Sequence, residues 1–95
     1  MNELIRDALC DMGHEEALLF DNPDYDEAIL GVTDEGQVVY DYDKMVQILV
    51  DREGWEEMEA IEFIEYNTIR ALPYFQNAPI IMNRLRLEEE YHGAN

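Results

Sequence analysis

A stretch from Gly54 to Leu72 constrains the fold of this chain more than any other feature. On a helix of 3.6 residues per turn, its aliphatic residues fall on one broad arc, and its glutamates fall on the opposite side. This helix must therefore bury one face against a core. Pro73 is expected to end it, because proline lacks the amide hydrogen that a continuing helix needs. The expected core-facing arc comprises Ala60, Ile61, Phe63, Ile64, Asn67, Thr68, Ala71 and Leu72.

Two further helices are expected, one at the amino terminus and one directly before the organising helix. Asn2 can cap the first helix, which carries a single apolar stripe and ends at Gly13. Asp41 or Asp43 can cap the second helix, over residues 44–53. Because almost no linker separates the second helix from the organising helix, the two are expected to form an antiparallel helical hairpin.

The clearest strand signal is a β-hairpin in the middle of the chain. Residues 28–33 and 37–40 are rich in aliphatic and β-branched side chains and flank Asp34, Glu35 and Gly36. A three-residue loop that ends in glycine suits a type I turn followed by a bulge, because glycine accepts the left-handed conformation there.

The remaining segments give weaker signals. Residues 17–20 suit either a strand or a helical turn, with a short strand preferred. Residues 79–82 suit an edge strand with proline at its start, and residues 84–91 suit a short terminal helix. The sequence thus predicts one α+β domain over residues 1–95, with three main helices packed on a small antiparallel sheet built around the hairpin.

The charge balance limits the partners that the chain can take. The sequence holds 23 acidic and 6 basic residues, which give a net charge of -17. Direct binding to nucleic acid or to an anionic membrane is disfavoured, because each phosphate contact would add repulsion. Cys10 is the only cysteine, so no intramolecular disulfide is expected, and no apolar run approaches the ~20 residues of a membrane span. These features favour a cytoplasmic protein.

No sequence motif predicts catalysis, a cofactor or a metal site. Asp21, Asp24 and Asp26 superficially suggest a calcium loop, but the required 1-3-5 spacing, the glycine at position six and the glutamate at position twelve are missing. His14 and His92 have no companions at metal-ligand spacing. Glycine-rich phosphate loops and serine nucleophile elbows are also missing. We therefore expect a protein that is not an enzyme and that binds no cofactor or metal.

The acidic side of the organising helix is the candidate partner-binding surface. Glu59, Glu62 and Glu65 recur every three residues, with no basic residue one turn away to offset them. Apolar side chains among them can supply affinity while the charge steers the encounter. The alternative is a solvated face whose charge serves solubility only. The full candidate surface, with acids from the loops added, comprises Asp24, Asp26, Asp34, Glu35, Trp55, Glu56, Glu57, Glu59, Glu62, Glu65 and Tyr66.

Three stretches, residues 31–45, 62–74 and 78–82, resemble a family of short acidic proteins of unknown function from phages and prophages of gut bacteria. The resemblance extends roughly over residues 17–82, and Tyr-Asn-Thr-Ile-Arg-Ala-Leu-Pro is its most specific part. One departure is Glu56, where similar sequences are expected to carry a Thr or Ser cap. The resemblance implies a phage setting in a bacterial host cell and supplies no activity. By analogy of class, small acidic phage proteins include anti-CRISPR proteins and other nucleic-acid mimics that inhibit host defence.

Together these observations predict a phage binding protein that occupies a basic, nucleic-acid-binding site on a host protein. Duplex DNA carries one charge per ~1.7 Å of axis, and a helix rises ~1.5 Å per residue. Glutamates concentrated in the first three turns of the organising helix therefore offer a lower but comparable charge density. The alternative is a phage accessory or structural interaction module whose charge only provides solubility.

Overall fold

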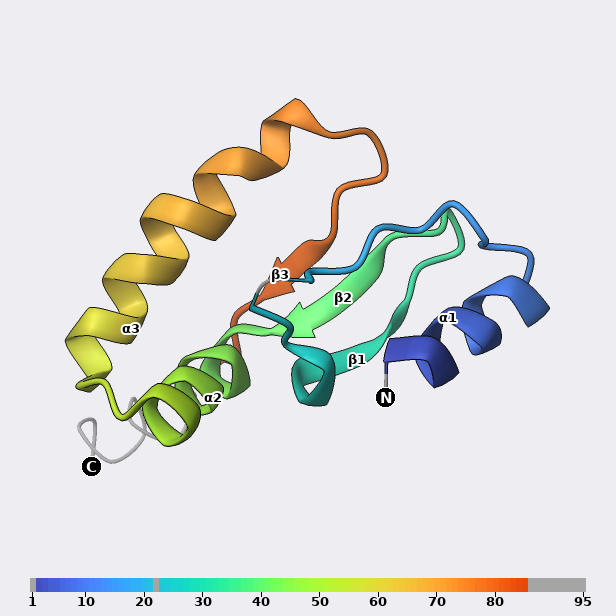
Figure 1. The fold of residues 1–95 in the computed structure, drawn as a ribbon. Helices are drawn as coiled ribbons and strands as arrows, with labels where there is room; N and C mark the ends of the chain where they lie inside the picture. Colours follow the sequence, from blue (N-terminus) through green and yellow to red (C-terminus); the bar gives the residue numbers. More distant parts are fainter. Residues whose placement is uncertain (1, 22, 86–95) are drawn as a thin grey trace, which may run out of the picture.

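The computed structural model describes residues 2–21 and 23–85, which form a small α+β domain with three α-helices and a three-stranded mixed sheet (Figure 1). The sequence predicts a short terminal helix at residues 84–91. Residues 84 and 85 are not helical, and residues 86–91 lie outside the described residues. The elements, in chain order, are α1 (Asn2–Asp11), the 3-10 turn η1 (Asp26–Ala28), β1 (Ile29–Val32), β2 (Val38–Asp41), α2 (Tyr42–Glu53), α3 (Glu57–Phe63), the π turn η2 (Ile64–Thr68), the 3-10 helix η3 (Ile69–Tyr74) and β3 (Ile80–Met82).

The predicted β-hairpin is confirmed. Strands β1 and β2 pair antiparallel, with a bulge in β1 between Ile29 and Gly31. At the turn, the Gly36 amide donates to the Thr33 carbonyl at 2.9 Å, and the Thr33 amide donates to the Gln37 carbonyl at 2.8 Å. Gly36 has a φ of 90°, a left-handed conformation that glycine adopts without steric cost.

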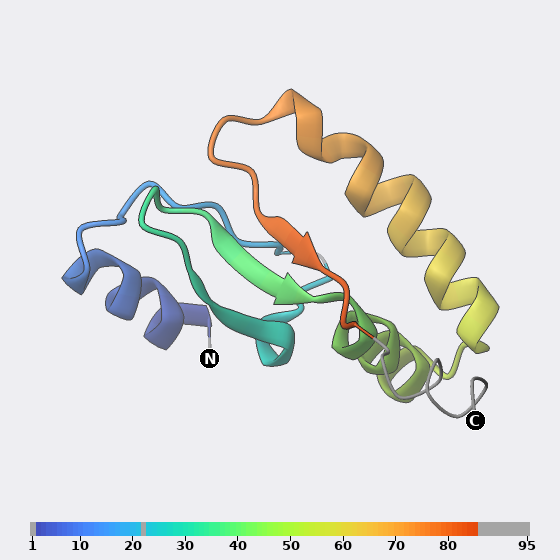
Figure 2. The same ribbon diagram turned by 180° about the vertical axis from the view of Figure 1, so that it is seen from behind.

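The third strand corrects the prediction of a purely antiparallel sheet. Strand β3 follows Pro79 as expected, but it pairs parallel to β2, with Val39 opposite Ile80. The direction follows from the connection, because the chain passes through α2 and the long helix before it returns alongside β2 (Figures 1 and 2). The Gln37 side chain, which donates to the Ala78 carbonyl at 2.9 Å, also ties this segment to the hairpin.

The segment before the hairpin contains no strand, so the preferred assignment of residues 17–20 is wrong. An aromatic cluster of Phe20, Tyr25 and Tyr40 holds it to the sheet instead. The Phe20 ring lies 5.7 Å from the Tyr25 ring and 4.6 Å from the Tyr40 ring, measured between centroids. The Phe20 amide donates to the Tyr40 hydroxyl at 3.0 Å. A side-chain hydroxyl thereby satisfies a backbone donor that a strand ladder would otherwise have paired.

Helix α2 begins two residues earlier than predicted, directly after β2. Asp41 caps it, and its carboxylate accepts a hydrogen bond from the Asp43 amide at 3.1 Å. The same carboxylate accepts three hydrogen bonds from Arg84 beyond β3, at 2.5 Å from Nη2 and at 3.1 Å and 3.3 Å from Nε, which is shared between the two carboxylate oxygens. Gly54 ends the helix in the left-handed conformation, with a φ of 74°. One buried carboxylate therefore joins the start of α2 to the end of the sheet.

The organising helix forms as one continuous helical segment in which α3 passes into η2 and then η3 (Figure 1). Ala60, Ile64 and Thr68 are buried, which confirms the predicted core-facing arc at these positions. Pro73 does not end the helix as expected but lies inside η3, so the helix ends two residues later than Leu72, at Tyr74.

One further expectation for the long helix is wrong. Asn67 is exposed, because the wider π turn, closed by a bond from the Ile69 amide to the Ile64 carbonyl, rotates Asn67 away from the buried side.

Helix α2 and the first turns of the long helix run in opposite directions and contact each other (Figures 1 and 2). The Tyr42 hydroxyl at the start of α2 donates to the Glu65 carboxylate at 3.2 Å, so the expected antiparallel helical hairpin forms over the length of α2.

Helix α1 packs less completely than its apolar stripe predicts. Leu9 is buried, whereas Leu4 and Met12 are 73% and 60% exposed. The Arg6 side chain donates to the Ala17 carbonyl at 2.6 Å and ties α1 to the following segment.

The Cα radius of gyration is 15.0 Å, against about 12 Å for a compact domain of this length. The domain is therefore elongated and leaves apolar side chains at its surface.

Ile64→Ala should lower the free energy of unfolding by about 2–5 kcal/mol, because Ile64 is fully buried and its removal leaves a cavity. Met58→Ala on the exposed side of α3 is the matched control and should change stability by less than about 0.5 kcal/mol. Chemical denaturation measures both variants. Equal losses in the two would contradict the orientation of this helix.

Tyr40→Phe should destabilise the protein by about 1–2 kcal/mol, because it leaves the Phe20 amide without its acceptor. Burial, more than any neighbouring charge, raises the pKa of the Tyr40 phenol to about 12, so the hydroxyl stays protonated at ordinary pH. Tyr25→Phe is the matched control. The Tyr25 hydroxyl is also buried but accepts from no described backbone amide, and the Thr68 side chain is its polar neighbour, so its removal should cost less than removal of the Tyr40 hydroxyl in urea denaturation.

Asp41 should contribute to stability in a pH-dependent way. Its hydrogen bonds from Arg84 are the main reason that the pKa of the Asp41 carboxyl lies below its usual value. A carboxyl with a lowered folded-state pKa stabilises the fold above its unfolded pKa of about 3.9, and that contribution is lost as the pH falls through the folded value. The difference in unfolding free energy between the wild-type protein and Asp41→Asn should therefore shrink below about pH 4. A difference that stays constant from pH 7 to pH 2 would rule out this contribution.

Candidate functional site

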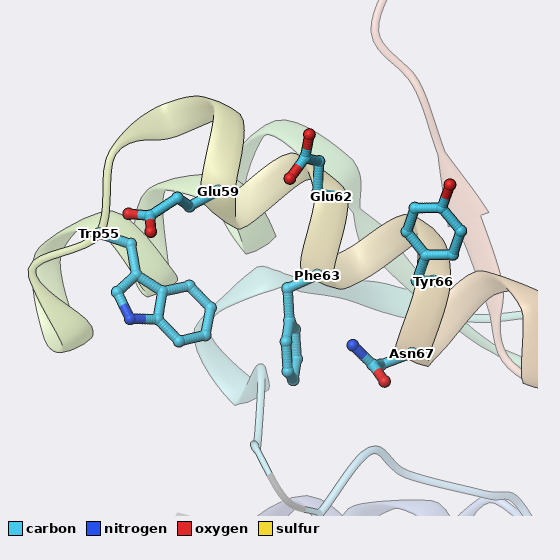
Figure 3. A pocket seen from close by; sticks show the side chains of 6 residues that line it. All are labelled: Trp55, Glu59, Glu62, Phe63, Tyr66 and Asn67. Atoms are coloured by element: carbon cyan, nitrogen blue, oxygen red, sulfur yellow. The ribbon is translucent and has the colours of Figure 1, made fainter.

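A shallow groove of about 340 Å³ follows the exposed side of α3 and η2 (Figure 3). It joins residues from the predicted surface with two that the prediction omitted, Phe63 and Asn67. Phe63 was expected only in the core and Asn67 only on the buried arc. The six lining residues are Trp55, Glu59, Glu62, Phe63, Tyr66 and Asn67.

Aromatic rings form much of this groove. The Trp55 and Phe63 rings lie side by side, with centroids 5.2 Å apart and planes tilted by 59° (Figure 3). Tyr66 projects from the next turn and is 66% exposed. The guanidinium carbon of Arg70 lies 5.4 Å from the centre of the Tyr66 ring, within the range of a cation–π contact. The groove therefore offers ring surface that already accepts one cation from its own chain.

Two exposed carboxylates, Glu59 and Glu62, accompany the rings. The Glu59 carboxylate accepts a hydrogen bond from the Glu56 amide at 3.0 Å, so Glu59 also fixes the start of α3. Within residues 2–21 and 23–85, the ion pairs link arginines to aspartates, and none involves a glutamate of the long helix. The negative charge of Glu62 is thus available to an external cation.

The other glutamates of the long helix occupy different positions. Glu56 and Glu57 are exposed at the start of α3, next to Trp55. Glu65 accepts a hydrogen bond from the Tyr42 hydroxyl of α2 at 3.2 Å and does not line the groove. Burial first, and then Glu65, raises the pKa of the Tyr42 phenol. Glu65 therefore connects the two helices at this point.

The acidic residues of the loops do not extend the surface as expected. Asp34 and Glu35 lie in the β1–β2 turn, at the end of the sheet away from α2 and the start of α3 (Figures 1 and 2). Asp26 is only 8% exposed, and Asp24 lies 3.7 Å from Arg52 of α2. The candidate site is therefore smaller than the predicted surface and is centred on α3.

A second groove, of about 320 Å³, begins where the first one ends. It is mainly apolar and shares Asn67 with the acidic and aromatic groove. No local pattern in the sequence predicts this groove, because its walls come from three separate segments of the chain. The lining residues are Leu18, Leu19, Phe20, Asp21, Asn67, Thr68, Ala71, Leu72, Phe75 and Pro79.

Comparisons with known proteins found no match for this chain, whether a family model, a curated protein or a solved structure. In the described part of the chain, no helix has the length and apolar character needed to cross a bilayer. Over those same residues, no group of three or more His, Cys, Asp or Glu side chains is placed to hold a metal ion.

Salt should stabilise this protein. The glutamates of the long helix repel one another without ion pairs among the described residues, and added ions screen that repulsion. The melting temperature should therefore rise between 10 mM and 200 mM sodium chloride, as measured by circular dichroism. A flat or falling trend would mean that carboxylate repulsion does not limit the stability of the fold.

Proposed function

We propose that this chain is a non-enzymatic binding protein that occupies a basic, nucleic-acid-binding site on a host protein. The observation that carries the proposal is the grouping of Glu59 and Glu62 with the rings of Trp55 and Tyr66 in one exposed groove. Glu56 and Glu57 continue the negative charge toward the start of α3. Carboxylates in this arrangement would occupy positions that phosphates take when the partner binds nucleic acid.

Charge and ring surface would have separate roles in this binding. The net charge of -17 draws a basic partner toward the protein and speeds the encounter. Aromatic side chains then provide buried contact area, which dominates the affinity of most protein interfaces. The exposed glutamates have no ion pairs with described residues to give up, so a cationic partner can pair with them at little cost.

The proposed setting is the cytoplasm of a bacterial host during phage infection, where the protein would inhibit a nucleic-acid-binding factor such as a CRISPR effector. This setting rests on the resemblance of residues 31–45, 62–74 and 78–82 to phage proteins. The alternative is an accessory module that associates through apolar contacts. The exposed side chains of Leu4 on α1, Met12 directly after α1 and Leu30 on β1 favour that alternative.

Capture of host proteins from bacterial lysate, followed by mass spectrometry, tests the proposal. Glu62→Lys should weaken capture of the partner at least tenfold, because it places a positive charge in the groove. Glu35→Lys is the matched control, since it makes the same change of charge in the β1–β2 turn, and it should have little effect.

Competition by nucleic acid distinguishes mimicry from other acidic binding. Added duplex DNA or RNA should displace the wild-type protein from the purified partner, and the affinity should fall steeply with salt. If nucleic acid and this protein bind the partner at the same time, or if their association does not weaken with salt, the proposal of nucleic-acid mimicry is wrong. The alternative, an accessory module, is then favoured.

A further inference from the structure

The two grooves form one continuous surface along the long helix. The acidic and aromatic groove lies over α3 and η2, the apolar groove lies over η2 and η3, and Asn67 belongs to both. The π turn from Ile64 to Thr68 places Asn67 at this junction. Turns of this kind are rare and are frequent at functional sites, because they change the direction in which side chains leave a helix.

The first groove has the chemistry of a guanidinium site. An arginine side chain is planar, pairs with carboxylates through two parallel hydrogen bonds and stacks on aromatic rings, whereas lysine carries a compact, strongly hydrated charge. Glu59 and Glu62 supply the carboxylates, and Trp55 and Phe63 supply the rings. The contact of Arg70 with Tyr66 is an example of the same pairing within the chain.

The second groove has the chemistry of a site for a large apolar side chain. Leu18, Leu72 and Phe75 line it from different segments, and Phe75 is 56% exposed although it is aromatic. Asp21 adds a carboxylate to its lining. An apolar side chain that filled this groove would cover the exposed ring of Phe75, and a neighbouring basic residue would be compatible with Asp21.

We propose that the joined grooves bind a linear segment of the partner protein that carries an arginine and a large apolar residue. Glu62 in the first groove and Ala71 in the second are separated by about 14 Å along a helix that rises about 1.5 Å per residue. An extended peptide spans about 3.3 Å per residue and alternates its side chains between two faces, so the arginine and the apolar residue should be four positions apart, on the same face of the peptide. This inference deepens the proposed function and takes from it only that the occupant is a protein.

The single tryptophan makes this binding directly measurable, because Trp55 lines the first groove and its fluorescence reports on it. The probes are capped glycine–serine peptides with one arginine and one leucine four positions apart. Two matched peptides carry lysine in place of the arginine or serine in place of the leucine. We expect saturable changes in fluorescence, with affinity reduced at least threefold by the lysine exchange and at least tenfold by the serine exchange.

Variants assign each preference to its groove. Glu62→Gln should remove the preference for arginine over lysine while keeping the preference for leucine over serine. Phe75→Ser should do the reverse. Glu35→Gln is the control for general charge attraction and should change neither preference. Circular dichroism before titration verifies that each variant is folded.

The possible results separate this inference from the proposed function. If the wild-type protein binds all three peptides equally, or if Glu35→Gln weakens binding as much as Glu62→Gln, the inference that the joined grooves bind an arginine and an apolar residue is wrong. In that case, loss of partner capture by Glu62→Lys together with competition by DNA would still support the proposed function. Peptide discrimination without competition by nucleic acid would support the site and contradict the mimicry.

Discussion

One aromatic cluster supports much of this fold, because it fixes a segment that has no backbone pairing of its own. Phe20 packs on Tyr25 and Tyr40, and its amide donates to the Tyr40 hydroxyl. Residues 18–21 are thereby held in the position where they line the apolar groove opposite the long helix. Tyr40 belongs to β2, which leads directly into α2 through Asp41. The cluster thus links the sheet, the irregular segment and one wall of the candidate site.

Local sequence signals predicted most of the helices and strands. The features that were not predicted depend on contacts between residues far apart in the sequence. The periodic burial of Ala60, Ile64 and Thr68 and the glycine of the hairpin turn depend on residues close in sequence, and both predictions are confirmed. The parallel direction of β3 depends on the path of the intervening chain, which no local pattern contains. The burial of Tyr25 could not be predicted either, because it lies among loop-forming residues and packs against Phe20, itself held by the sheet.

The candidate site was predictable only where it follows a single helix. Trp55, Glu59, Glu62 and Tyr66 recur at helical spacing, so their grouping in one groove could be expected from the sequence. The exposure of Asn67 depends on a π turn, which the helix-forming tendencies of the individual residues do not predict. The apolar groove requires three distant segments to meet. The loop acids do not join the surface on α3, because Asp34 and Glu35 lie at the far end of the sheet, Asp26 is buried and Asp24 lies against Arg52.

The parallel pairing of β3 has a consequence for the order in which the chain acquires its parts. Val39 and Ile80 are about forty residues apart, and closing a loop of that length costs roughly 3 kcal/mol of chain entropy. The hairpin and the helices involve much shorter separations, so they can form before β3 docks. Pro79, which precedes β3, is part of the apolar groove. The groove is therefore completed late in folding, and a newly made chain would gain its full binding surface only after its carboxyl-terminal strand has joined the sheet.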